Sequence, residues 1–311
     1  MAYLPPETFE ADTFPGYVVH DPARDRDIPI VVRYPRDATG PLPVVVFSPG
    51  GAYVPRATGY SEWGTLLARA GYFTVNLSHP EAAGGAHCAP LAIPASECDA
   101  AHFVIGEPAE GGTLNGPWYH RPMDARAVLD DLAAIAEAAG VSVDLDRIAI
   151  VGHSGGAFTT MALAGARIDY SPSVRAVDMS DPRPRAFLAN SPQGVGHVGL
   201  TETSWDLIAR PVMTQTGRND RTEGEPPSGR LDAAMHMPAP DKYLTYLDSE
   251  DATHSVFGLG PDASRMLELY VGSAGVAFLD AYVRDRSDAR TWLGSGSIDE
   301  WSDGVATIMS R

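Results

Sequence analysis

Short apolar runs alternate with helix-like segments along this chain, and that alternation restricts its fold more than any other feature of the sequence. Runs such as 43–47 are apolar throughout, as expected of strands covered on both faces. Segments such as 61–70 place apolar side chains at helical spacing instead. Strands that alternate with helices form parallel sheets. We therefore predict an α/β fold with a doubly wound, mostly parallel central sheet flanked by helices.

The individual elements follow from the same pattern. Strands are expected at 28–34, 43–47, 72–77, 148–151, 186–189, 212–215 and 243–247. Helices are expected at 61–70, from about Arg121 to 139 with Pro122 in the first turn, from about Gly155, and from about 263 to 282. The chain contains no internal repeat and no linker-like tract, so residues 1–311 are predicted to form a single domain.

A Gly-, Ala- and Pro-rich stretch at about 78–118 shows no clear periodicity. Loops of this length are unusual and are often functional. Because it follows a predicted strand, it leaves the sheet on the side where ligands bind. A cap-like insertion and a tolerated surface insertion both remain open. Both cysteines, Cys88 and Cys98, lie in this stretch, where either a local disulfide or two reduced thiols fits.

The motif Gly152-His153-Ser154-Gly155-Gly156 carries the chemistry. A G-x-S-x-G pattern alone is weak, but this one directly follows strand 148–151 and precedes a helix of small residues. That strand–turn–helix setting is typical of a nucleophile elbow. The tight turn leaves no room for side chains two residues before and after the serine. We predict that Ser154 is a nucleophile; a structural Gly-rich turn is the alternative.

A serine hydroxyl needs a base to accept its proton, and in such chains the acid and then the histidine follow the nucleophile. Among the histidines after Ser154, His197 and His236 are placed less well than His254, which follows strand 243–247 by a short loop. His254 is therefore the predicted base. Asp220, just after strand 212–215, is the predicted acid. Three other carboxylates compete for the role of the acid because they lie close to His254 in sequence, and we interpret them as turn residues or solvated charges: Asp248, Glu250 and Asp251.

The oxyanion that forms during acyl transfer needs two backbone N–H donors. Gly155 is predicted to supply one, and Gly51 the other, from the loop at 48–53 (the oxyanion loop), with Ala52 as the alternate. An ordinary Pro-Gly turn is the competing interpretation of that loop. The candidates for lining the substrate pocket are Ala52, Tyr53, Trp118 and His153.

These motifs resemble the α/β-hydrolase superfamily, near its platelet-activating-factor acetylhydrolase, cutinase-like and dienelactone-hydrolase-like esterases. The resemblance spans about residues 28–293. It implies a triad of Ser154, Asp220 and His254, oxyanion donors at Gly51 and Gly155, and no metal or organic cofactor. The sequence segments that carry the resemblance are 45–51, 66–75, Arg121-Pro-Met-Asp124, 146–154, 217–220 and 252–254.

The chain departs from these relatives at three places. Many have His-Gly where this chain has Pro49-Gly50, and the polyester hydrolases have an aromatic residue where it has Gly51. Dienelactone hydrolases proper use a cysteine at the position of Ser154. The resemblance therefore does not specify the substrate. It favours a serine carboxylic ester hydrolase for small to medium esters. A lipid or polyester hydrolase, an acyltransferase and a non-catalytic binding protein of the same fold are the alternatives.

Composition limits the partners. A net charge of −17 repels phosphates and anionic membranes, so nucleic acid is not expected as a partner. No apolar run approaches the ~20 residues that span a bilayer, and no metal-binding motif is present. The N-terminus lacks a signal-peptide pattern, so a cytoplasmic location is expected. A small-molecule ester is the expected partner, with a homo-oligomer left open.

Overall fold

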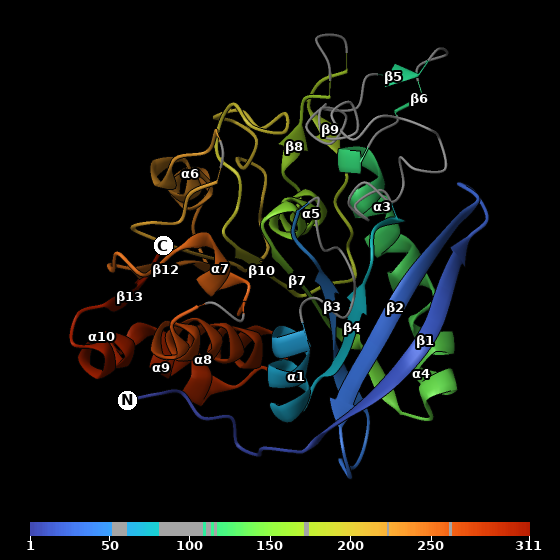
Figure 1. Ribbon diagram of the computed structural model, residues 1–311, viewed down its shortest axis with the longest axis horizontal. Coiled ribbons are helices and arrows are strands. Elements are labelled where there is room, and N and C mark those ends of the chain that lie inside the picture. The colour runs from blue at the N-terminus through green and yellow to red at the C-terminus, as the bar shows by residue number, and fades with distance from the viewer. Residues whose placement is uncertain are drawn as a thin grey trace.

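The computed structural model describes residues 1–51, 61–80, 108–109, 113–114, 117–170, 174–222, 224–260 and 263–311. At its centre is a nine-stranded mixed sheet (Figure 1). The strands follow one another across the sheet in the order β1 (Ala11–Asp21), β2 (Arg26–Pro35), β4 (Phe73–Leu77), β3 (Leu42–Ser48), β7 (Val143–His153), β10 (Ala186–Asn190), β11 (Val212–Gly217), β12 (Lys242–Leu247) and β13 (Ala306–Ser310).

The strands from β4 to β12 in this order are parallel to one another, whereas β1, β2 and β13 pair antiparallel at the edges. All seven predicted strands and the largely parallel α/β sheet are confirmed. Two small hairpin sheets lie outside it and pair β5 (Pro108–Ala109) with β6 (Thr113–Leu114) and β8 (Arg167–Ile168) with β9 (Val177–Asp178).

Helices cover both faces of the sheet. One face carries α3 (Pro117–Asp130), α4 (Leu132–Ala139) and α5 (Gly155–Ala164). The other carries α1 (Ser61–Arg69) and α8 (Arg265–Tyr282), with α9 (Ser287–Gly294) and α10 (Ser297–Ser302) packed beside α8. Three further short helices among the described residues lie in connections: η3 (Pro227–Leu231), α6 (Asp232–His236) and α7 (His254–Phe257).

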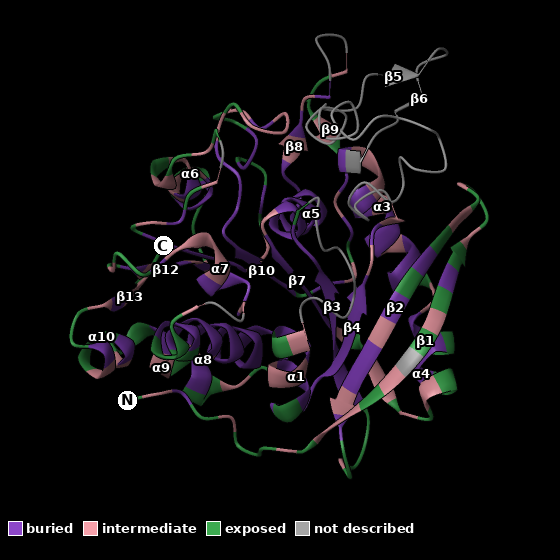
Figure 2. Cartoon of the chain, viewed as in Figure 1, coloured by how far each residue is buried: buried purple, intermediate pink, exposed green. Residues whose placement is uncertain are grey.

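The alternation of side chains along each strand divides the core between the two faces. In β3, Val44 and Val46 belong to one apolar cluster, and Val45 and Phe47 belong to the other. Successive side chains of a strand point to opposite faces, so a strand that is apolar throughout must be covered on both. Figure 2 shows these central strands buried, while exposed residues recur along β1 and β2 at the edge.

The helix expected from about Arg121 begins earlier, at Pro117, so the prediction of its start was wrong. Pro122 therefore lies inside α3 instead of in its first turn. An internal proline leaves the carbonyl four residues before it without its helical donor. That carbonyl belongs to Trp118, and it accepts a hydrogen bond from the Tyr170 hydroxyl at 3.3 Å. A distant side chain thus compensates for the lost helical bond.

Several predictions concern parts of the chain that the structure does not describe. Most of the 78–118 stretch lies outside the described residues, as do Cys88 and Cys98. The cap-like insertion and the local disulfide therefore stay predictions, and so does the assignment of residues 1–311 to one domain. None of the described helices is both long and apolar enough to cross a membrane.

Candidate active site

The site lies where the chain reverses its direction of progress across the sheet. β3 and β7 are neighbours; β4 is added beyond β3, and β10 is added beyond β7. In open α/β sheets, ligands bind outside the carboxyl ends of the strands at such a switch point. Ser48 and Gly152 are paired in register at these two ends. The start of the oxyanion loop and the predicted nucleophile turn are therefore side by side.

Ser154 occupies a strained turn between β7 and α5. Its φ of 54° and ψ of −119° belong to a region that non-glycine residues rarely adopt. A Cβ atom on Gly152 would lie 2.1 Å from the Gly156 carbonyl oxygen, and one on Gly156 would lie 1.9 Å from the Ser48 carbonyl oxygen. Neither position accepts a side chain. This geometry is the one that a nucleophile elbow requires, with Ser154 partly exposed at its tip.

Asp220 and His254 meet through the loops that follow β11 and β12. The residues just before them, Asn219 and Thr253, form a parallel bridge. His254 Nδ1 lies 2.8 Å from Asp220 Oδ1. The carboxylate is fully buried, whereas the imidazole is 22% exposed. A carboxylate in this position holds the proton on Nδ1 and leaves Nε2 free to accept one.

The surroundings of Asp220 keep it ionised. Burial alone would raise its pKa, but His254, Arg230 and Ser191 stabilise the carboxylate and hold the pKa below its usual value. The guanidinium of Arg230 is itself buried, with Nε 3.9 Å from Asp220 Oδ1. The Thr216 hydroxyl donates to the other carboxylate oxygen at 2.8 Å. At neutral pH this carboxylate can therefore stabilise an imidazolium on His254.

The sequence reasoning missed a further group of this site, Ser191. Its hydroxyl donates to Asp220 Oδ1 at 2.7 Å and lies 2.8 Å from His254 Nδ1, so it contacts both the predicted acid and the predicted base. Its φ of 54° is again in the left-handed region. Ser191 directly follows the buried strand β10. A polar residue at the carboxyl end of a buried strand was the signal that could have identified it.

His153, a candidate pocket residue, is buried against the predicted base. Its Nε2 donates to the His254 carbonyl oxygen at 3.0 Å, and the two rings lie 4.6 Å apart between centroids. Burial, together with the charge of His254, lowers the pKa of His153 to about 3. The ring is therefore neutral at neutral pH. Its contacts hold the segment that carries His254 next to the elbow.

The two predicted oxyanion donors are neighbours. A Cβ atom on Gly155 would lie 3.4 Å from the amide nitrogen of Gly51. Trp118, by contrast, is only 8% exposed and packs edge-on against Phe158 at 5.1 Å between centroids, which favours core packing over pocket lining. The pocket residues Ala52 and Tyr53 lie outside the described residues and stay predictions.

The competing residues are engaged elsewhere. His197 lies 3.6 Å from Glu225, and the ring of His236 stacks on Trp205. Asp248 and Glu250 both pair with Arg218 at the surface. None of these four residues therefore competes with Asp220 for His254.

Ser154 and His254, both described in full, make no direct hydrogen bond to each other; catalytic bonds of this kind commonly tighten only when substrate is bound. The described residues contain no group of three or more His, Cys, Asp or Glu side chains that could hold a metal ion.

In comparisons with known proteins, no family model matches this chain. No curated protein matches it either.

Proposed function

We propose that this chain is a serine carboxylic ester hydrolase of the α/β-hydrolase fold that acts on small to medium esters through an acyl-enzyme. The observation that carries the proposal is the 2.8 Å contact between His254 Nδ1 and Asp220 Oδ1 at the edge of the sheet that presents Ser154. A histidine oriented by a buried carboxylate is the device that turns a serine hydroxyl into a nucleophile.

In this mechanism, His254 Nε2 accepts the hydroxyl proton while the Ser154 oxygen attacks the ester carbonyl. The amides of Gly51 and Gly155 stabilise the negative charge on the tetrahedral intermediate. His254 then protonates the leaving alcohol, and an acyl group remains on Ser154. Water, deprotonated by the same histidine, releases the acid and restores the hydroxyl. A lipid or polyester hydrolase differs only in substrate, and an acyltransferase only in the second nucleophile.

Hydrolysis of p-nitrophenyl esters from acetate to palmitate tests the proposal, with wild type and Ser154→Ala compared in parallel. We expect a wild-type rate that falls at least about 10³-fold in the variant. The chain-length optimum would separate small esters from lipids. Ser264→Ala, at an exposed serine that makes no capping hydrogen bond, is the matched control and should keep the wild-type rate. A Ser154→Ala variant as active as wild type would refute the proposal.

A further inference from the structure

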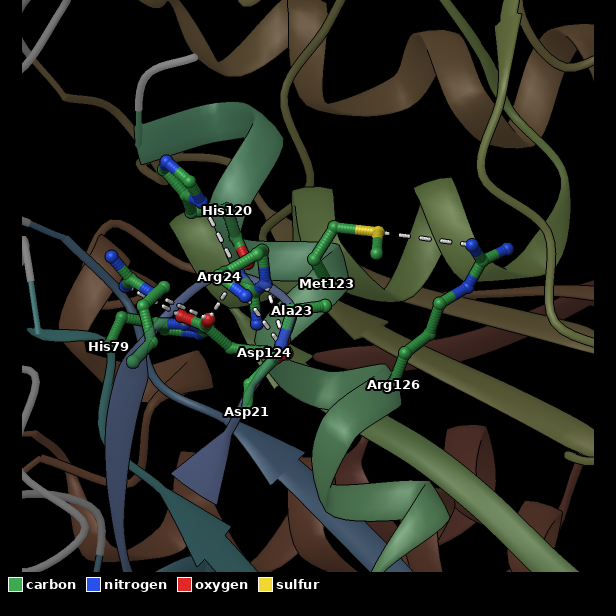
Figure 3. A network of polar contacts seen from close by, with 9 residues as sticks. Asp21, Ala23, Arg24, His79, His120, Met123, Asp124 and Arg126 are labelled. Atoms are coloured by element: carbon green, nitrogen blue, oxygen red, sulfur yellow. Dashed lines mark hydrogen bonds and ion pairs between the residues drawn. The ribbon is translucent and has the colours of Figure 1, made fainter. Parts of the chain in front are cut away.

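Helix α3 carries a buried polar network that the proposed reaction does not use (Figure 3). At its centre, Asp124 Oδ2 lies 2.9 Å from His79 Nδ1. Asp124 Oδ1 lies 2.7 Å from Nη1 of Arg24, in the turn between β1 and β2, and 3.1 Å from Nε of Arg26, the first residue of β2. Burial would raise the pKa of Asp124, but His79 and Arg26 hold it at about 2. The carboxylate is therefore ionised.

The network reaches the end of strand β3 through His79. Its Nε2 lies 2.9 Å from the hydroxyl oxygen of Ser48. Ser48, His79 and Asp124 are all buried, at 0%, 1% and 0% exposure. A serine, a histidine and an aspartate are thus in hydrogen-bonded sequence, as in a catalytic triad, yet solvent does not reach the serine. A role in holding the backbone fits this burial better than a role as nucleophile.

The Asp124 carboxylate fixes the direction of one of these hydrogen bonds. An ionised carboxylate can only accept, so His79 donates to it from Nδ1–H. Arg24 also pairs with Asp21, which extends the ionic contacts of the network to a second carboxylate. On the other side of the ring, Nε2 and the Ser48 hydroxyl share one hydrogen bond. That bond holds the side chain of Ser48 whichever of the two atoms donates.

Ser48 begins the oxyanion loop. The carbonyl oxygen of Ser48 packs so closely on Gly156 that no side chain fits at position 156. Ser48 also pairs in register with Gly152. The next carbonyl, that of Pro49, accepts a hydrogen bond from Arg121 at 2.9 Å. Arg121 and Asp124 are three residues apart, on one face of α3. One helix face therefore holds the loop at two successive residues.

We propose that Ser48, His79 and Asp124 are positioning residues that hold the Gly51 amide where it can stabilise the oxyanion. The inference rests on the proposed function and deepens it. When the bond between Ser48 and His79 is removed, residues 48–51 lose one of the two side-chain hydrogen bonds described above, and the Gly51 N–H moves away from the developing charge. Oxyanion contacts are made in the transition state, so the loss falls on kcat and not on KM.

Ser48→Ala tests this directly when an ester is compared with its thionoester, in which sulfur replaces the carbonyl oxygen. Sulfur accepts hydrogen bonds weakly, so the preference for the oxygen ester reports on the oxyanion donors. We expect kcat for the ester to fall about tenfold or more, KM to change little, and the preference for the ester to shrink. Rates are counted per active site by titration with a fluorophosphonate, so that unfolded chains do not contribute.

Three further variants keep the test specific. His79→Asn retains a side-chain nitrogen near Asp124 but cannot reach Ser48, so it should show the same kinetic loss. The double variant of Ser48→Ala and His79→Asn should lose no more of kcat than either single variant, because both substitutions remove the same hydrogen bond. Asp21→Asn is the control: it disturbs Arg24 at the far side of the network and should leave the ester preference unchanged.

The outcomes separate this inference from the proposed function. A Ser48→Ala variant with wild-type kcat, or one that loses rate equally on ester and thionoester, would overturn the positioning role alone. A fluorophosphonate adduct on Ser48 would also overturn it, since that serine would then be a nucleophile. A wild-type chain that hydrolyses neither ester would overturn both.

Discussion

Ser191 matters to this site through two hydrogen bonds that no sequence motif marks. Its hydroxyl is bonded to Asp220 and adjacent to His254 Nδ1. Without it, the carboxylate loses a donor and the imidazole loses one of two oxygen neighbours. We expect Ser191→Ala to lower kcat about tenfold with little change in KM. Steady-state hydrolysis of a p-nitrophenyl ester measures both.

The control is Thr216→Val, which removes a hydroxyl from the other oxygen of Asp220 without touching His254. Its effect on kcat should be smaller. Equal losses would mean that only the carboxylate matters, and not the contact with His254. Ser191→Gly should be as slow as Ser191→Ala but up to about 1 kcal/mol more stable, because glycine adopts a φ of 54° without strain.

At the scale of elements, the elbow depends on two glycines. Gly152→Ala and Gly156→Ala each place a methyl group about 2 Å from a backbone oxygen that cannot move independently. We expect each to reduce the free energy of unfolding by more than about 3 kcal/mol. Gly229→Ala is the control, since its nearest atom would be 3.9 Å away. Urea unfolding measures all three, and a Gly156→Ala variant of wild-type stability would contradict the packing described here.

The sequence predicts the parallel strands well and the edges poorly. β3 is buried along its whole length, so it reads as an unbroken apolar run. β13 at the edge has intermediate and exposed residues, such as Met309 at 50%, and gives no comparable pattern. The prediction of where α3 starts was wrong for another reason. A proline inside the helix is tolerated there because the hydroxyl of Tyr170, distant in sequence, donates to the carbonyl oxygen of Trp118. Local patterns cannot report such partners.

At the scale of the whole molecule, the triad could be proposed because each member follows a strand and parallel strands end at one edge. The same rule also applies to His79, which closely follows β4, and to Ser191. They were missed because their partners depend on the sheet order. Ser48 meets His79 only because β4 lies beside β3, and the sequence alone does not give that neighbour.

Stability against acid should also depend on His153. Its pKa is about 3 in the folded chain, through burial, and ordinarily 6.5. Between these values the unfolded chain binds a proton that the folded chain does not, so stability falls as the pH drops from about 6.5 toward 3. We expect this residue to contribute a slope of about 1.4 kcal/mol per pH unit in that window. His153→Gln should remove that slope in urea unfolding, and an unchanged slope would contradict it.

Activation of Ser154 by Asp220 and His254 can be measured as the rate of covalent labelling with a fluorophosphonate, followed by mass spectrometry of the peptides. We predict one adduct, on the peptide that contains Ser154, and labelling at least about 10³-fold slower in His254→Asn. No adduct at Ser154 in the wild type, or an equal rate in the variant, would contradict this activation.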